Sequence, residues 1–136
     1  GNEVMNWFSV FIYSGFLFSS VACADINHVL KEQDYSESFK ESFYQAYNIG
    51  PNFNGDDYIF SYGCGGGAIC ANIYDSQKEK FVDFPDGYLI DSEKIEFELK
   101  FSKESSKLCI SGESAYDATI YSNVCYLYND GQLTQE

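Results

Sequence analysis

NFNGDDYIFSYGCGGGAICANIYDSQKEKFVDFP, the stretch from Asn52 to Pro85, decides the fold of this 136-residue chain. It contains three apolar runs, separated first by the glycine-dense turn Gly63–Gly67 and then by the polar turn Asp75–Glu79. Runs rich in Tyr, Phe, Ile and Val with short connections are typical of antiparallel strands, because crossover helices need longer connections. The strands predicted here are 58–62, 68–74 and 80–84.

The most regular strand pattern lies farther along the chain. From Ile95 to Phe101 apolar and charged residues alternate without exception, so one face is expected to be buried and the other wet. Two more strands are predicted at 107–111 and 120–128, and Asn129-Asp130-Gly131 marks a final turn.

A helical pattern precedes the strands, between Asp25 and Asn48. The aromatic residues Phe39, Phe43 and Tyr47 recur at helical spacing and form one apolar stripe, which is typical of core packing. Ser36 or Ser38 can cap the start of the helix, and Gly50-Pro51 ends it. The predicted fold class is mainly β (α+β): an antiparallel meander of about six strands with one N-terminal helix, stapled by disulfides.

The first 24 residues have the properties of a secretion leader. The run Trp7–Ala22 is uncharged, and Ala22-Cys23-Ala24 fits the small-x-small cleavage pattern, which leaves 25–136 as a single β-rich domain. The run is shorter than the roughly 20 residues of a membrane span, although an uncleaved anchor is the main alternative. Met5 is the natural start, which makes 1–4 an upstream remnant.

Cys23 has a second interpretation. The sequence Val21-Ala22-Cys23 matches the last positions of a bacterial lipoprotein box, so Cys23 is either discarded with the leader or lipidated. If the leader is cleaved, only a lipidated Cys23 would place the protein on a membrane. Either reading predicts a location in the periplasm or the cell envelope.

Four cysteines remain after the leader, and their even number in a small exported domain predicts two disulfides. Three pairings are open: a 64–70 bridge would close a loop around the glycines, and a 109–125 bridge would join two long strands. Zinc binding is disfavoured because the chain has no CxxC pair and His28 is its only histidine. No metal or cofactor is expected. The predicted disulfide cysteines are Cys64, Cys70, Cys109 and Cys125.

The charge of the chain limits its partners. Its 21 Asp and Glu residues outnumber 8 basic residues, all of them Lys, and the formal net charge is −13. Nucleic acids and anionic lipids need a cationic surface, and arginine is the preferred contact to phosphate, so these partners are excluded. A strongly acidic surface attracts a basic protein and accelerates their encounter, although solubility alone is the alternative explanation.

No catalytic residues are predicted. The GCGGGA turn lacks the Lys-Ser/Thr pair of a phosphate-binding loop, and His28 is isolated near the start of the mature domain. The alternation of Asn52, Asn54 and Asp56 resembles the beginning of a calcium loop, but Gly63 stands where the closing Glu is required.

Several motifs resemble a group of small, mostly uncharacterised exported proteins of Gram-negative bacteria, periplasmic or lipoprotein-like, whose core reads Asn-Phe-x-Gly, Gly-Cys-Gly, Ile-x-Asp. The matching residues are Asn52-Phe53-Asn54-Gly55, Tyr62-Gly63-Cys64-Gly65 and Ile73-Tyr74-Asp75. The resemblance implies export and a β-rich fold, and it supplies no activity.

The chain departs from that group at two informative positions. Ala68 stands where the second cysteine is expected, and Cys70 follows two residues later, so the bridge to Cys64 either survives with a wider loop or re-pairs with Cys109 or Cys125. Glu79 replaces a turn glycine, so either the turn type changes or Glu79 adopts the left-handed conformation at a cost of about 1 kcal/mol.

These observations predict a non-enzymatic exported binding protein. Its most concrete form is an immunity or inhibitor protein whose acidic surface neutralises a basic toxin or hydrolase. The alternatives are a passive envelope protein or lipoprotein with a structural role, and a small hydrolase or thiol-redox enzyme. The oligomeric state is left open. The predicted partner contacts are Asp56, Asp57, Asp83, Asp86, Glu96 and Glu98.

Overall fold

The computed structural model describes residues 26–136. The chain divides into two compact units, residues 1–34 and 35–136, and the described part of the first unit holds a short helix, α2 (Ile26–Val29), followed by turns. The predicted leader and the alternative lipidation site Cys23 lie outside the described residues. No helix within residues 26–136 is long and apolar enough to cross a membrane.

The second unit begins with its one main helix, α3 (Glu37–Ile49). Ser36 is the N-cap, because its backbone is extended and its hydroxyl accepts a hydrogen bond of 3.2 Å from the backbone N–H of Phe39. At the other end, the N–H of Gly50 donates to the carbonyl of Ala46 at 3.0 Å. The helical pattern predicted from Asp25 is therefore broken by turns before Ser36, and the stretch forms two helices.

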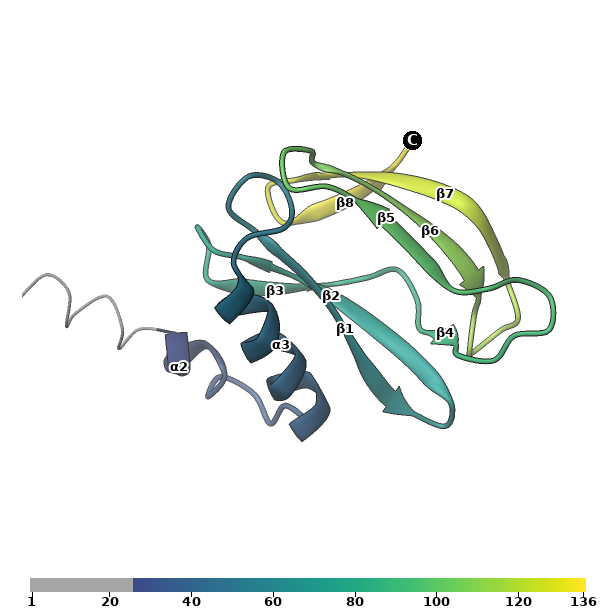
Figure 1. The fold of residues 1–136 in the computed structure, drawn as a ribbon, viewed down its shortest axis with the longest axis horizontal. Coiled ribbons are helices and arrows are strands. Elements are labelled where there is room, and N and C mark those ends of the chain that lie inside the picture. The colour runs from purple at the N-terminus through teal and green to yellow at the C-terminus, as the bar shows by residue number, and fades with distance from the viewer. Residues whose placement is uncertain (1–25) are drawn as a thin grey trace, which may run out of the picture. The chain divides into compact units, whose positions relative to one another are not determined.

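Eight strands follow, all paired antiparallel, in two four-stranded sheets (Figure 1). In the first sheet the order is β1-β2-β3, and the short β4 pairs with the other end of β2. The second sheet has the order β5-β6-β7-β8. The strands are β1 (Tyr58–Gly65), β2 (Ala68–Asp75), β3 (Lys80–Asp83), β4 (Tyr88–Leu89), β5 (Glu98–Phe101), β6 (Lys107–Glu113), β7 (Ile120–Asn129) and β8 (Gln132–Gln135).

The predicted fold class is confirmed, with two corrections. The count of about six strands is low, because β4 has two residues and β8 is largely polar, so neither leaves an apolar pattern. The strand predicted from Ile95 forms ladder pairs only from Glu98 onward. Exposure does alternate along 95–100, but the apolar residues there are half-buried rather than buried, and Phe101, predicted on the same buried face, is exposed.

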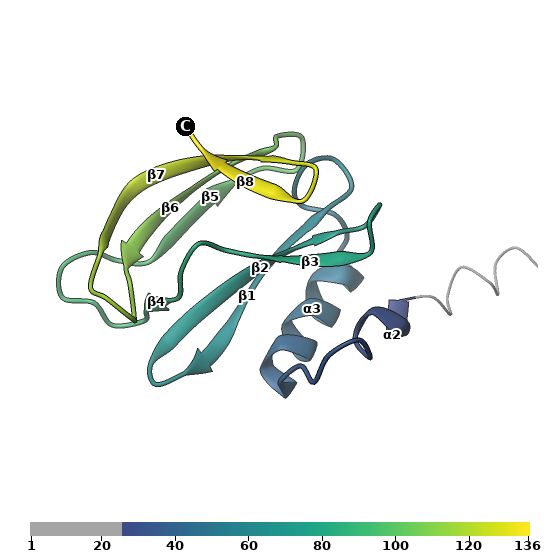
Figure 2. The same ribbon diagram turned by 180° about the vertical axis from the view of Figure 1, so that it is seen from behind.

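The second unit has three layers, with helix α3 on one face of the first sheet and the second sheet on the other (Figures 1 and 2). Successive β1 residues point to opposite faces, so Phe60 faces the helix and Ile59 faces the second sheet. The Phe39 and Phe60 ring centroids are 5.1 Å apart, and those of Phe43 and Tyr74 are 5.0 Å apart. A second set of buried residues fills the space between the two sheets. It contains Ile59, Ala71, Ile73, Tyr88, Leu108, Ile110 and Tyr126.

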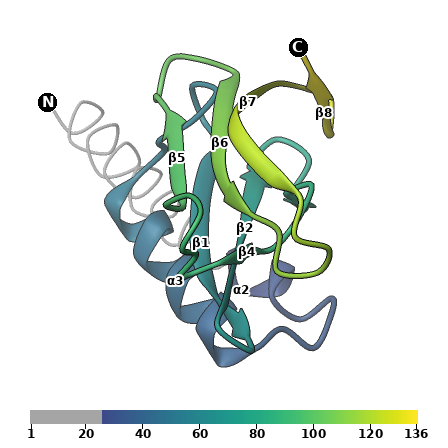
Figure 3. The same cartoon turned by 90° about the vertical axis from the view of Figure 1, so that its right-hand side faces the viewer.

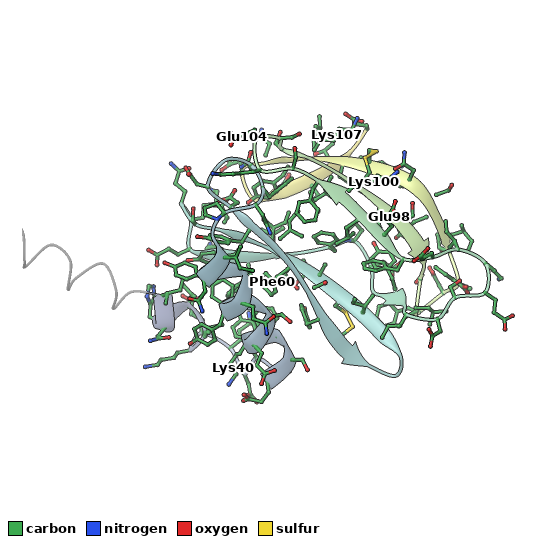
Figure 4. The ribbon with its side chains drawn as sticks, in the orientation of Figure 1. Lys40, Phe60, Glu98, Lys100, Glu104 and Lys107 are labelled. Carbon is green, nitrogen blue, oxygen red and sulfur yellow. A yellow bond between two sulfur atoms is a disulfide. The ribbon has the colours of Figure 1, made fainter. Side chains whose placement is uncertain are left out.

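The four predicted cysteines form two disulfides, Cys64–Cys70 within the β1–β2 hairpin and Cys109–Cys125 between β6 and β7 (Figure 4). Of the alternatives predicted for Cys64, the bridge to Cys70 with a wider loop is therefore the observed one. Paired cysteines indicate a protein of an oxidising compartment, outside the cytoplasm. Glu79 has φ 53°, so the β2–β3 turn keeps its type with a non-glycine residue in the left-handed region.

Candidate functional site

An acidic groove lies where the β2–β3 turn meets the β7–β8 turn. Figure 2 shows the two turns at the same end of the molecule, opposite the β1–β2 tip. The groove has a volume of about 800 Å³, and one basic residue, Lys78, lines it. Its carboxylates come from segments far apart in the sequence: Asp56, Asp57, Asp75 and Asp130.

The antiparallel register of the first sheet brings two of these carboxylates together. Tyr58 at the start of β1 pairs with Tyr74 near the end of β2, so the residues just outside this pair, Asp57 and Asp75, lie at the same end of the hairpin. Ser76 connects the two segments, because its N–H donates to Asp57 Oδ1 at 3.0 Å and its hydroxyl donates to the Asp56 carbonyl at 2.9 Å.

Asp75 forms the floor of the groove and is buried. Its Oδ1 accepts hydrogen bonds from the backbone N–H groups of Gln77 and Lys78, at 3.1 and 3.0 Å, which fixes the β2–β3 turn. Its Oδ2 accepts a 2.5 Å hydrogen bond from the Tyr128 hydroxyl on β7. Burial, and then the hydrogen bond to Asp75, raise the pKa of Tyr128, so this hydroxyl stays a neutral donor.

Asp57 was expected to be an exposed contact residue, and this expectation is wrong. Only 4% of Asp57 is exposed. Its two carboxylate oxygens are used within the fold, because Ser76 donates to Oδ1 and the Asn54 amide donates to Oδ2 at 2.9 Å. Asp57 therefore contributes negative charge to the groove wall, while its hydrogen bonds hold the loop before β1.

The exposed carboxylates of the groove are Asp56 and Asp130. The Asp56 side chain accepts no hydrogen bond within residues 26–136, whereas Asp130 Oδ1 lies 2.7 Å from Lys78 Nζ. The hydrogen bond from Lys78 lowers the pKa of Asp130, and the same bond raises the pKa of Lys78. This pair places one ammonium group against one of the exposed carboxylates that line the groove.

The other predicted contacts lie elsewhere. Asp83 is exposed at the end of β3 and accepts a 2.7 Å hydrogen bond from the amide of Asn72. Asp86 is half-buried. Glu96 and Glu98 are exposed, and Glu98 forms an ion pair of 3.5 Å with Lys100 on the outward face of the second sheet (Figure 4). The six predicted carboxylates therefore do not form one surface, and the groove combines two of them with two that were not predicted.

Sequence reasoning missed Asp75, Asp130 and Tyr128 as members of one site. Asp75 and Asp130 were recognised only as turn residues, and Tyr128 only as a strand residue. The local signals show that each turn exists, but the contact between Asp75 and Tyr128 spans 53 positions. Only the packing of the two sheets brings them together.

Metal ligation has no geometric support in the described part of the chain. Among residues 26–136 no group of three or more His, Cys, Asp or Glu side chains is placed to hold a metal ion. Two of the three residues that resembled a calcium loop, Asn52 and Asn54, have structural roles. The Asn52 amide donates to the Ile59 carbonyl at 2.9 Å and its Oδ1 accepts from the Ile59 N–H at 2.7 Å, while Asn54 donates to Asp57.

The fold and the groove together define a small, disulfide-stapled, three-layer α+β protein with an acidic cleft. A comparison of the chain with models of protein families, with curated proteins and with solved structures found no match. The geometry and charge of the groove are therefore the features from which a function can be inferred.

Proposed function

We propose that this chain is a non-enzymatic exported binding protein that neutralises a basic protein partner, most concretely a toxin or hydrolase, through the acidic groove. The observation that carries the proposal is the convergence of four carboxylates on a groove of about 800 Å³ with one lysine in its lining. The two disulfides support a location outside the cytoplasm, and the proposed location is the periplasm or cell envelope.

The rigidity of the groove favours binding of a complementary surface. Asp57 and Asp75 are held by backbone and side-chain donors, so their charges are in place before a partner arrives. Preorganised charge reduces the ordering cost of association and steers the encounter with an oppositely charged protein. A lysine or arginine of the partner can pair with Asp56 and can take the place of Lys78 at Asp130.

One capture experiment both identifies the partner and tests whether it binds at the groove. The oxidised protein is immobilised, exported bacterial proteins are passed over it at moderate salt, and retained proteins are identified by mass spectrometry. The test variant is Asp56→Lys, which reverses one exposed charge of the groove. The matched control is Glu41→Lys, which makes the same change at an exposed position of helix α3 that does not line the groove.

The proposal predicts a basic protein that the wild type and Glu41→Lys retain and that Asp56→Lys releases. Its association rate should fall with rising salt, because steering between exposed charges is screened. Retention that is equal for all three proteins would reject the groove as the binding site. A mixture of weakly held proteins that elutes at moderate salt would indicate that the acidic surface serves solubility.

A further inference from the structure

A second surface lies at the opposite end of the β1–β2 hairpin and centres on Tyr116. The Tyr116 side chain belongs to the β6–β7 loop and is 74% exposed, more than any other aromatic residue in the described chain. Its ring nevertheless packs against Gly87, next to Cys70. A β-carbon at Gly87 would lie only 3.1 Å from Cε2 and from the hydroxyl of Tyr116, and 3.3 Å from Cys70 Sγ.

The loop that carries Tyr116 is tied to the first sheet. Figure 3 shows β4 close to the end of the β6–β7 hairpin, and Tyr88 of β4 forms a bridge with Ser114. The Ser114 hydroxyl accepts from the N–H groups of Tyr116 and Asp117, at 3.1 and 3.2 Å, and donates to Asp86 Oδ1 at 2.9 Å. The loop is therefore ordered without a partner.

Asp86 is the residue that fixes this arrangement. Its Oδ1 also accepts from the Gly87 N–H at 2.9 Å, and its Oδ2 accepts from the Tyr121 hydroxyl at 3.0 Å. The carbonyl of Gly87 accepts a further 2.9 Å bond from Ala115. Asp86, for which a partner contact was predicted, is half-buried, and its hydrogen bonds hold the segment that precedes Tyr116. The partner contact itself stays a prediction.

Two exposed carboxylates accompany the ring. Asp117 follows Tyr116 directly, and hydrogen bonds from Thr119 lower the pKa of Asp117, so it is ionised. Asp83 and Tyr116 both lie close enough to the Tyr62 hydroxyl to raise the pKa of Tyr62, after the larger effect of burial. The surface thus combines an exposed aromatic ring that packs against Gly87 with negative charge, and none of the residues that form it is basic.

We propose that this Tyr116 surface, formed by Tyr116, Tyr62, Gly87, Asp83 and Asp117, is an interaction surface for a protein that presents an arginine side chain. A guanidinium group stacks on an aromatic ring while it pairs with a carboxylate, which an ammonium group does less well. Tyrosines that are rigid before binding are frequent hot spots of protein interfaces. Tyr62 of this surface lies five positions along the chain from Asp57 of the groove, which is about 17 Å at the spacing of a β-strand. The inference stands even if the groove binds nothing.

The test uses the isotope-labelled, oxidised full chain and a short glycine peptide with one arginine, followed by chemical-shift changes in NMR spectra. The same peptide with citrulline removes the charge, and the peptide with lysine keeps the charge but not the planar group. Tyr116→Ala removes the ring, and Tyr116→Phe is the matched control that retains it. Because Tyr116 is exposed, both variants are expected to fold, which their spectra will verify.

The expected result is a set of shifts at Tyr116, Gly87 and Asp117 that the arginine peptide causes and the citrulline peptide does not. Binding of the arginine peptide should be about fivefold weaker in Tyr116→Ala and within about twofold of wild type in Tyr116→Phe. Equal binding to wild type and Tyr116→Ala would overturn the inference. Shifts confined to Asp56 and Asp130 would also overturn it, while leaving the proposed function of the groove intact.

Discussion

At the scale of single residues, two buried tyrosines differ in whether the hydroxyl group has a hydrogen-bond partner. Tyr128 donates a 2.5 Å hydrogen bond to the buried carboxylate of Asp75. Tyr88 is completely buried against Phe97 and Tyr121, and its hydroxyl has no hydrogen-bond partner within residues 26–136. A hydrogen bond to a charged group contributes to stability, whereas a buried polar group without a partner costs free energy.

The pair yields a prediction. Tyr128→Phe should lower the free energy of unfolding by about 2 kcal/mol, because it leaves a buried carboxylate with one donor fewer. Tyr88→Phe, the matched control, should leave the free energy of unfolding unchanged or raise it slightly, because the lost hydroxyl had no partner. Urea unfolding of the two variants measures both values, and a larger loss in Tyr88→Phe than in Tyr128→Phe would contradict this account.

Sequence reasoning succeeded where the residue type itself carries the information and failed where tertiary contacts decide. The even number of cysteines predicted two disulfides, and both are present. Asp57 looked like any acidic residue before a strand, because nothing local shows that Ser76 and Asn54 donate to its carboxylate. The hydrogen bonds of Asp86 could not be foreseen for the same reason, since its donors Ser114 and Tyr121 lie 28 and 35 positions away.

At the scale of elements, the two disulfides constrain the chain to different degrees. Cys64 and Cys70 are separated by 6 positions within one hairpin, whereas Cys109 and Cys125 are separated by 16 and join two directly paired strand residues. In the loop-entropy description a longer closed loop removes more conformational freedom from the unfolded chain.

We therefore expect the 109–125 bridge to be the more stabilising one. Replacement of Cys109 and Cys125 by Ala should lower the free energy of unfolding by about 3 kcal/mol, and replacement of Cys64 and Cys70 by about 2 kcal/mol. Denaturant unfolding of the two double variants gives the comparison. The reverse order would mean that the glycine-rich tip, rather than the longer loop, dominates the effect.

Most elements could be predicted from the sequence because their patterns are local. The stripe of Phe39 and Phe43 predicted a helix with a buried face, and these two rings do pack on the first sheet. The turn at Glu79 was placed correctly as well. The strand from Ile95 was predicted too long, because alternation reports which face is buried, while ladder hydrogen bonds require a neighbouring strand.

At the scale of the whole molecule, the three layers are filled with aromatic side chains, and this gives the protein a characteristic response to alkali. Burial raises the pKa values of Tyr62, Tyr74 and Tyr121 to about 12 from the ordinary value of 10.0. Above pH 10 these tyrosines ionise in the unfolded chain but stay neutral in the folded one. Their contribution to stability is therefore complete below pH 10 and is lost as the pH rises towards 12.

Unfolding by urea at a series of pH values tests this expectation. The free energy of unfolding should be insensitive to tyrosine ionisation up to about pH 9 and should fall steeply between about pH 10 and pH 12. The variant Tyr74→Phe should show a shallower fall, whereas the exposed control Tyr116→Phe, which removes only a minor influence on the pKa of Tyr62, should stay close to wild type. A fall that is equally steep in Tyr74→Phe would show that burial of Tyr74 does not contribute.

The fold and charge of the whole molecule lead to its proposed role as a neutralising protein. The most direct test of this role is to titrate the protein against the activity of its partner. The basic partner retained by the immobilised protein is assayed for its own toxic or hydrolytic activity while the chain is added in increasing amounts. The account predicts complete loss of activity near equimolar addition, equal inhibition by Glu41→Lys, and about tenfold weaker inhibition by Asp56→Lys. Full activity of the partner at saturating binding, or undiminished inhibition by Asp56→Lys, would contradict it.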